Sequence, residues 1–360
     1  MATDEHPESS RVRPLRSRAE LAWGVVAILF AILLWRAAGL FLLLFAALLF
    51  ASFLQGISEV LTARTRLSFG WSLPIVLLLL CVLVVGTVWL LAPRVADQIG
   101  RLAATLPQVL KRYAGTLEQY QLGRWMLSRA PPWSEVYAGL GSLLISVGGF
   151  FSSALGIIVD GILVFVIGLY LAVQGESYRE GMLRLLPAAR RHRAREVLAV
   201  VESTLRNWLV GKTVSMAVLG VMAFIGLSLL KIPLALTLAL ITALLTFIPN
   251  FGAVLSVILP VLIALTQSPV QALYVLVFYA FMQHLEGYFI TPMIMKRAIQ
   301  LPPALLITAQ VFMAYFFGLA GLALAAPLTA VALVLVKMLY VEDVLGEKVD
   351  LPGHEGTEDS

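Results

Sequence analysis

Long apolar runs separated by short polar segments extend over most of this chain. A helix needs about 20 mostly apolar residues to cross the roughly 30 Å hydrocarbon core of a bilayer. Runs of about this length occupy residues 19–35, 37–57, 71–92, 143–173, 208–230 and 270–290. The first two are interrupted only by Arg36, so we expect a tight helical hairpin there and three transmembrane helices within residues 19–92.

The apolar segment 232–265 is long enough for two crossings, but helix-breaking residues interrupt its middle. Pro249 supplies no backbone N–H, Asn250 is a favourable helix N-cap, and Gly252 permits close backbone approach. We therefore expect one half-helix to end here and another to begin.

The segment 302–340 has the same design, with Gly318 and Gly321 at its centre. Broken backbone at membrane depth is tolerated only against protein or a water-filled cavity. Paired Pro/Gly-interrupted segments are also typical of transporter binding sites. Two ordinary short hairpins with interfacial turns are the alternative for each segment alone, but their occurrence together favours re-entrant hairpins.

Two polar connecting regions are more than loops. In the region 93–142, apolar residues recur at helical spacing up to residue 120, which predicts an amphipathic helix on the membrane surface or against a neighbouring subunit. The basic segment 174–206 contains seven arginines, which we expect to meet lipid headgroups or water, and it leads into the core 207–340. Residues 1–18 and 341–360 are polar ends, and the second is expected to be disordered.

Composition supports a membrane protein. Hydrophobic residues make up 60% and charged residues 13% of the chain, whereas soluble domains contain about 25% charged residues. The mean hydropathy is +0.92, and the single cysteine, Cys81, has no partner for a disulfide within the chain. We expect an all-α polytopic membrane protein: a helical bundle with two broken hairpins and an amphipathic surface helix.

The net charge of +5 bears on the orientation of the chain in the membrane and leaves the predicted fold class unchanged. Basic residues fall between the apolar runs and accompany no nucleic-acid motif, so nucleic acid is not an expected partner. Most of the lysines and arginines lie in the loops that would share one side with the N-terminus. By the positive-inside rule, both termini are predicted to be cytoplasmic.

Charged side chains inside the bilayer are costly, so each one is informative. Glu286 stands out in the second half, because Lys212 and Lys231 lie near the ends of their span and can extend to the interface. Tyr279, Gln283 and Glu286 share one helix face by their spacing. Such a stripe can line a substrate or ion pathway, or it can fix helix packing through hydrogen bonds of about 0.6–2 kcal/mol.

Other polar residues leave more than one interpretation open. Asp160 must be paired, hydrated or protonated if it is buried, so a proton-carrying role and an ordinary helix contact are both possible. Glu286 could lie near the cytoplasmic interface, because Thr291 and Pro292 are expected to end its helix soon afterwards. His284 is expected to pack or lie at the interface rather than bind metal, and no metal or cofactor is predicted.

Several short motifs carry a family resemblance. They occupy residues 248–252, 283–287, 291–292, 301–303 and a glycine-rich closing helix at 318–330. In order and spacing they resemble the autoinducer-2 exporter family of bacterial membrane proteins, from the N-terminal hairpin through Tyr340. One departure is Lys296, where many members have glycine. The resemblance implies an oligomeric permease-like protein of the bacterial inner membrane, with some members associated with autoinducer-2 export and others with cation/proton antiport.

Three functions therefore compete. The first is secondary export of a small polar molecule, the second is sodium (cation)/proton antiport, and the third is a membrane scaffold that transports nothing. An enzyme is not expected, because the chain contains no H-E-x-x-H, G-x-S-x-G or P-loop motif. The expected partners are the bilayer, a small polar solute or cation, and further copies of the chain. The predicted pathway residues are Asp160, Pro249, Asn250, Gly252, Tyr279, Gln283, Glu286, Gly318 and Gly321.

Overall fold

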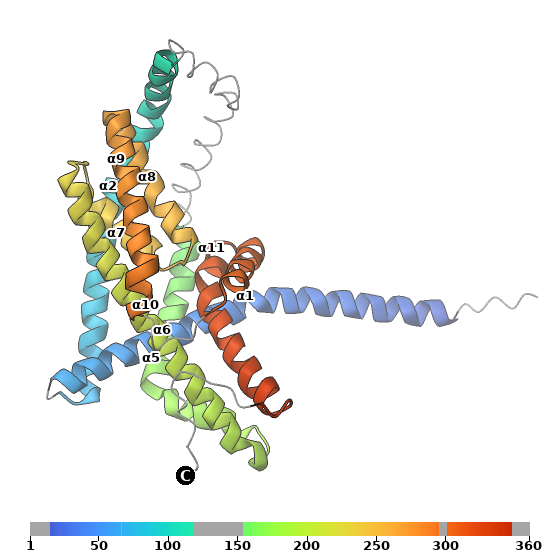
Figure 1. Cartoon of the computed structure of the whole chain (residues 1–360). Helices are drawn as coiled ribbons and strands as arrows, with labels where there is room; N and C mark the ends of the chain where they lie inside the picture. Colours follow the sequence, from blue (N-terminus) through green and yellow to red (C-terminus); the bar gives the residue numbers. More distant parts are fainter. Residues whose placement is uncertain (1–14, 66, 118–153, 295–300, 348–360) are drawn as a thin grey trace, which may run out of the picture.

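A computed structural model describes residues 15–65, 67–117, 154–294 and 301–347, and these ranges form helices joined by short turns (Figure 1). The elements are α1 (Leu15–Arg64), α2 (Phe69–Leu117), α5 (Ala154–Arg184), α6 (Ala188–Leu229), α7 (Ala235–Leu245), α8 (Phe251–Gln267), α9 (Pro269–Leu285), η1 (Glu286–Ile290), α10 (Thr291–Ile294), α11 (Pro303–Leu335) and η3 (Val336–Glu342). No strand occurs in these ranges. The predicted all-α class is confirmed.

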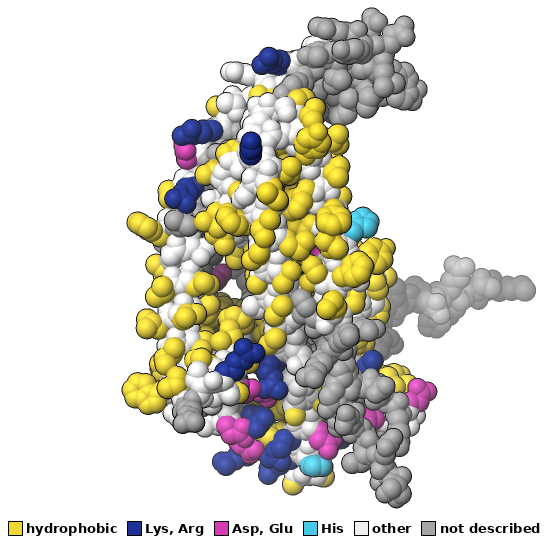
Figure 2. All heavy atoms as spheres, turned by 60° about the vertical axis from the view of Figure 1, so that its left-hand side comes forward, with side chains coloured by type: hydrophobic (Ala, Val, Ile, Leu, Met, Phe, Trp, Pro, Cys, Tyr) yellow, Lys and Arg dark blue, Asp and Glu magenta, His cyan; other side chains and the backbone are white. Residues whose placement is uncertain are grey.

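The molecular surface has the character of a membrane protein. Six helices within the described ranges are long and apolar enough to cross a bilayer. Hydrophobic side chains cover the middle of the face shown in Figure 2, while most charged side chains gather toward its lower end. A soluble protein rarely exposes so large an apolar area. The chain is therefore a multi-pass membrane protein.

The hairpin predicted at Arg36 is wrong. Helix α1 runs from Leu15 to Arg64 without interruption, and its N-terminal half projects away from the other helices (Figure 1). Arginine is a good helix former, and no proline stands at this junction to end the helix. Residues 15–92 therefore contribute α1 and the start of α2 rather than three separate helices.

The amphipathic region after the next span is helical as predicted, but it is not a separate surface helix. Helix α2 continues through Pro93 to Leu117, and its end extends beyond α8 and α9 (Figure 1). A proline inside a helix removes one backbone hydrogen bond, and α2 continues despite that loss. Residues 118–142 of the predicted region, and residues 143–153 of the next predicted span, lie outside the described residues.

Helix α6 joins the arginine-rich segment to the following span without a break. Its arginines pair with acidic side chains of other helices. Arg193 lies 2.7 Å from Glu342 and 2.9 Å from Asp343, and Arg206 lies 2.6 Å from Glu59. These ion pairs connect the polar end of α6 with η3 and with α1.

The largest buried apolar cluster lies among α6, α7, α8 and α9. Leu219, Leu238, Ile263 and Val275 belong to it, one from each helix, and each is almost completely buried. This packing holds the α7–α8 hairpin between α6 and α9.

The first predicted break is confirmed between α7 and α8. Helix α7 has 11 residues, so it is about 17 Å long and too short to cross a 30 Å hydrocarbon core. Asn250 has φ of 62°, and a Cβ atom on Gly252 would collide with the carbonyl oxygen of Leu245. Glycine is thus required for the tight reversal, and the α7–α8 turn lies near the end of α9, where it borders the same cavity as Gln283.

A buried glutamine holds this turn in place. Gln310 of α11 is completely buried, and its side-chain nitrogen donates a hydrogen bond of 2.7 Å to the carbonyl oxygen of Pro249. Its side-chain oxygen accepts a hydrogen bond of 3.1 Å from the Asn250 side chain. Gln310 therefore satisfies polar groups that the broken helix leaves without helical partners.

The second predicted break is confirmed at Gly318. Helix α11 changes direction there, with φ of 60° and ψ of −144°, a backbone conformation that favours glycine. Gly321 is buried, and a Cβ atom on it would collide with the carbonyl oxygen of Met313. The two parts of α11 therefore approach closely at this kink.

Substituting Gly252→Ala tests the close approach between α7 and α8. The added Cβ must displace backbone at Leu245, so we expect a loss of about 1–3 kcal/mol, seen as a lower melting temperature of the detergent-solubilised protein. Gly86→Ala in α2 is the matched control, because nothing lies within 4 Å of the position that its Cβ would take, and it should leave the melting temperature unchanged or raise it. Equal effects of both substitutions would contradict the proposed crowding.

Replacing Gln310 by leucine tests its role as the anchor of the turn. Leucine cannot make either hydrogen bond, so polar groups of Pro249 and Asn250 lose a partner at a cost of about 1–3 kcal/mol. Thermal unfolding should show this loss for Gln310→Leu, but not for Thr308→Val, whose side chain is exposed on the same helix. An unchanged melting temperature for Gln310→Leu would show that the turn does not need this anchor.

Candidate functional site

A cavity of 780 Å³ lies where the α7–α8 turn meets α6, the end of α9 and the start of α11. Seven of the sixteen lining residues carry polar or charged side chains, and the other nine are apolar or glycine. The lining residues are Trp208, Lys212, Ser215, Thr246, Ile248, Pro249, Asn250, Ala253, Gln283, Glu286, Gly287, Thr291, Pro292, Leu301, Pro303 and Leu306.

The first wall is the broken segment itself. Pro249 and Asn250 line the cavity, and Gly252 is buried two residues further along, where α8 crosses the end of α7. Asn250 occupies the N-cap position of α8, but its side chain makes no capping hydrogen bond. The expected N-cap role is therefore wrong: the positive φ turns the side chain toward Gln310 instead.

The second wall comes from the end of α9. Gln283 and Glu286 line the cavity and are partly buried, whereas Tyr279 lies in the apolar core with its hydroxyl 2.8 Å from that of Thr242. Seven residues of helix cover about 10 Å along the axis, so one polar stripe can begin in the core and end in a cavity. Tyr279 thus fixes packing, and the other two residues face the cavity.

A π-helical turn begins at Glu286. In this η1 segment the N–H of Thr291 donates to the carbonyl oxygen of Glu286, five residues earlier. The helix then continues through Pro292 into α10, so the expected end at Thr291–Pro292 is wrong. The wider turn separates the proline ring from the preceding turn, and single π turns are frequent at functional sites.

The third wall, on α6, contains Lys212, which the sequence predicts at the membrane interface. Lys212 was expected to extend to the membrane interface, but it is only 5% exposed and lines the cavity beside Trp208 and Ser215. A sequence signal for this exists. Lys212 and Ser215 continue the same spacing as the buried residues Leu205 and Trp208, so the buried stripe of α6 passes into the cavity.

Among the residues that the structure describes, Lys212 and Glu286 are the charged residues that line this cavity. Their opposite charges attract one another across it. They do not form a direct ion pair, since no carboxylate oxygen of the described residues lies within 4.0 Å of the Lys212 ammonium. Each charge can therefore interact with a solute that enters between them.

The remaining predicted residues lie away from the cavity lining. Asp160 is exposed in the second turn of α5. Gly318 and Gly321 shape the kink of α11. His284 is exposed, and its Nδ1 lies 2.9 Å from the carbonyl oxygen of Ala280 while its ring stacks on Tyr288. Four of the nine predicted residues therefore meet in one cavity: Pro249, Asn250, Gln283 and Glu286.

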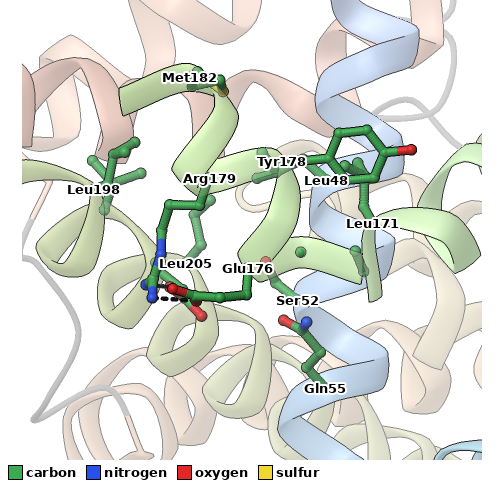
Figure 3. Close-up of a pocket in the computed structure, with 14 residues that line it drawn as sticks. Leu48, Ser52, Gln55, Leu171, Glu176, Tyr178, Arg179, Met182, Leu198 and Leu205 are labelled. Atoms are coloured by element: carbon green, nitrogen blue, oxygen red, sulfur yellow. Dashed lines mark hydrogen bonds and ion pairs between the residues drawn. The ribbon is translucent and has the colours of Figure 1, made fainter. Parts of the chain in front are cut away.

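A second, smaller cavity of 220 Å³ lies among α1, α5 and α6 (Figure 3). The Arg179 side chain pairs with Glu176 there and lies 3.6 Å from Glu202, while the Gln55 side chain donates to the carbonyl oxygen of Ala172 at 3.0 Å. These polar groups join the three helices to one another. The polar contacts around this cavity therefore stabilise the packing of α1, α5 and α6.

The chemistry available in the larger cavity is recognition by hydrogen bonds and charge. It presents one ammonium, one carboxylate, two amide side chains and the three hydroxyl groups of Ser215, Thr246 and Thr291. Among the residues that the structure describes, no group of three or more His, Cys, Asp or Glu side chains could hold a metal ion. The cavity can hold a small polar solute through its own side chains.

Comparison with known proteins agrees with this geometry. The family model of the AI-2E family transporters matches residues 24–340. "Putative transport protein sll0060" of Synechocystis sp. is 24% identical over 74% of this chain and 78% of its own length. "Putative transport protein YueF" of Bacillus subtilis is 23% identical over 66% of this chain and 68% of its own length. "Putative transport protein YrrI" of the same organism is 26% identical over 46% and 47% of the two chains.

The family match extends over both broken hairpins and over every wall of the cavity. It also agrees with the six helices of the described ranges that can cross a membrane and with the names of the relatives, which are those of transport proteins. The chain belongs to the AI-2E family of transporters.

Proposed function

We propose that this protein is a secondary transporter that exports a small polar solute across the bacterial inner membrane, with both termini in the cytoplasm. The observation that carries the proposal is the cavity at the broken α7–α8 turn, where a buried lysine, a carboxylate and the amide side chains of Asn250 and Gln283 meet inside an apolar bundle. Charged groups inside a membrane bundle are costly to bury, and those that are present commonly mark substrate or ion pathways.

The charges of the cavity favour a cargo without net charge. Lys212 and Glu286 balance one another, so a solute with a net charge would leave one charge without compensation. Autoinducer-2, which the family resemblance gives as the cargo of some members, is one candidate for this solute. The further copies of the chain that we expect as partners would pack against the exposed apolar faces of the helices.

Cation/proton antiport receives less support from the geometry. Antiport would depend on the two membrane carboxylates Asp160 and Glu286, but Asp160 is exposed on α5 and does not line the cavity. Lys212 also repels a cation that approaches Glu286. Export of a polar solute therefore fits the site better.

Cysteine accessibility tests the proposal without knowledge of the cargo. In a Cys81→Ser background, Ala253→Cys places a thiol in the cavity wall, and Val254→Cys places one on the neighbouring apolar surface, where Val254 is 65% exposed. A charged, membrane-impermeant methanethiosulfonate reacts with thiolate, which forms in water and not in lipid. We expect modification of Ala253→Cys to be at least about tenfold faster.

Alternating access, in which a transporter opens its site to each side of the membrane in turn, leads to a second prediction for Ala253→Cys. Ala253→Cys should be modified when the reagent is added to right-side-out vesicles and also when it is added to inverted vesicles, because a transporter opens its site to each side in turn. Modification of both cysteines at equal rates, or access from one side under all conditions, would contradict transport through this cavity.

A further inference from the structure

Two donors on α6 face the cavity without the partners that buried polar groups usually have. Lys212 is 5% exposed and Ser215 is 2% exposed, and their spacing of three residues places them on one face of the helix. The Ser215 hydroxyl has no hydrogen-bond partner among the described residues. A buried unpaired hydroxyl costs about 1–3 kcal/mol, so this pair of donors suits a ligand that carries an acceptor.

Acceptors occupy a different wall of the same cavity. Glu286 and Gln283 lie at the end of α9, and no basic nitrogen of the described residues lies within 4.0 Å of the Glu286 carboxylate. The cavity therefore has a positive donor wall on α6 and a negative acceptor wall at the junction of α9 and η1.

This arrangement discriminates among solutes by charge. A simple anion would satisfy Lys212 and leave Glu286 uncompensated, and a simple cation would do the reverse. A neutral diol would satisfy hydrogen bonds but would neutralise neither charge. A solute that carries one negative and one positive group can satisfy both walls at once.

The other lining residues indicate the rest of the solute. Trp208, Ile248 and Leu306 are apolar and border the two polar walls. The volume of 780 Å³ leaves room for an apolar substituent beside the charged groups, since sites for small molecules have volumes of about 300–1,000 Å³.

We infer that the cavity recognises zwitterionic solutes of the α-amino acid type with an apolar side chain. The carboxylate would bind Lys212 and Ser215, and the ammonium group would bind Glu286 and Gln283. The inference rests on the proposed function, because it assigns a cargo class to the cavity through which transport is proposed.

A matched set of ligands tests this assignment. Three of the ligands share the same branched apolar group. L-Leucine carries a carboxylate and an ammonium group, 4-methylpentanoate carries the carboxylate only, and 3-methylbutylamine carries the ammonium group only. Butane-2,3-diol represents neutral polar solutes. Isothermal titration of the full-length protein in lipid nanodiscs should show leucine binding at least about tenfold more tightly than the other three. Equal or tighter binding of the acid, the amine or the diol would overturn the assignment.

Substitutions then assign each charge to its wall. Lys212→Gln should weaken leucine binding and reduce its advantage over the amine, whereas Glu286→Gln should reduce its advantage over the acid. Lys231→Gln is the control, because this lysine is exposed and lies outside the cavity lining. If Lys212→Gln does not fold, Ser215→Ala removes one donor to the carboxylate and should weaken binding of leucine and the acid, but not of the amine. Parallel losses for all ligands would refute the two-wall assignment.

The cysteine variant separates this inference from the proposed function. If the cavity of Ala253→Cys is accessible from both sides and leucine does not slow its modification, the zwitterion assignment fails while transport stands. If the cavity is not accessible, both fail.

Discussion

Backbone polar groups in an apolar bundle need hydrogen-bond partners, and this constraint governs the second half of the chain. Where α7 ends and α8 begins, regular helical bonding stops, and Gln310 bonds the carbonyl oxygen of Pro249 and the side chain of Asn250. Gly252 lets the two short helices meet at the crossing. These hydrogen bonds fix the turn against α11, and Pro249 and Asn250 of the turn line the cavity.

The same constraint explains why function and fold share residues here. A continuous helix would satisfy its own backbone groups and could offer a solute only side chains. The broken segment brings Pro249 and Asn250 to the cavity, and α6 and α9 add opposite charges from two further directions. Family membership, the six helices of the described ranges that can cross a membrane, and this cavity all indicate a transporter.

Sequence reasoning succeeded where local chemistry decides the structure. The breaks at Asn250 and Gly318 follow from proline and glycine, and the helix face of Gln283 and Glu286 follows from spacing. It failed at Arg36 because a single charged residue does not end a helix. It also failed for Lys212, because distance along a helix does not reveal which neighbouring helices bury a side chain.

Long-range pairing was likewise invisible in the sequence. Gln310 is 60 residues from its partner Asn250 in the chain, and the apolar sequence around Gln310 does not indicate which residue it contacts. Asp160 was grouped with Glu286 because both are carboxylates in apolar runs, but the fold leaves Asp160 exposed on α5. These contacts depend on how the helices pack, which hydrophobic periodicity does not specify.

The depth of the α7–α8 turn is the central claim, and it can be measured by cryo-electron microscopy in lipid nanodiscs, where the bilayer itself gives density. The account predicts that residues 247–252 lie within the hydrocarbon layer, with the cavity beside Lys212 and Glu286 continuous with water on one side. A turn in the headgroup layer, with Lys212 and Glu286 enclosed in dry protein, would contradict it.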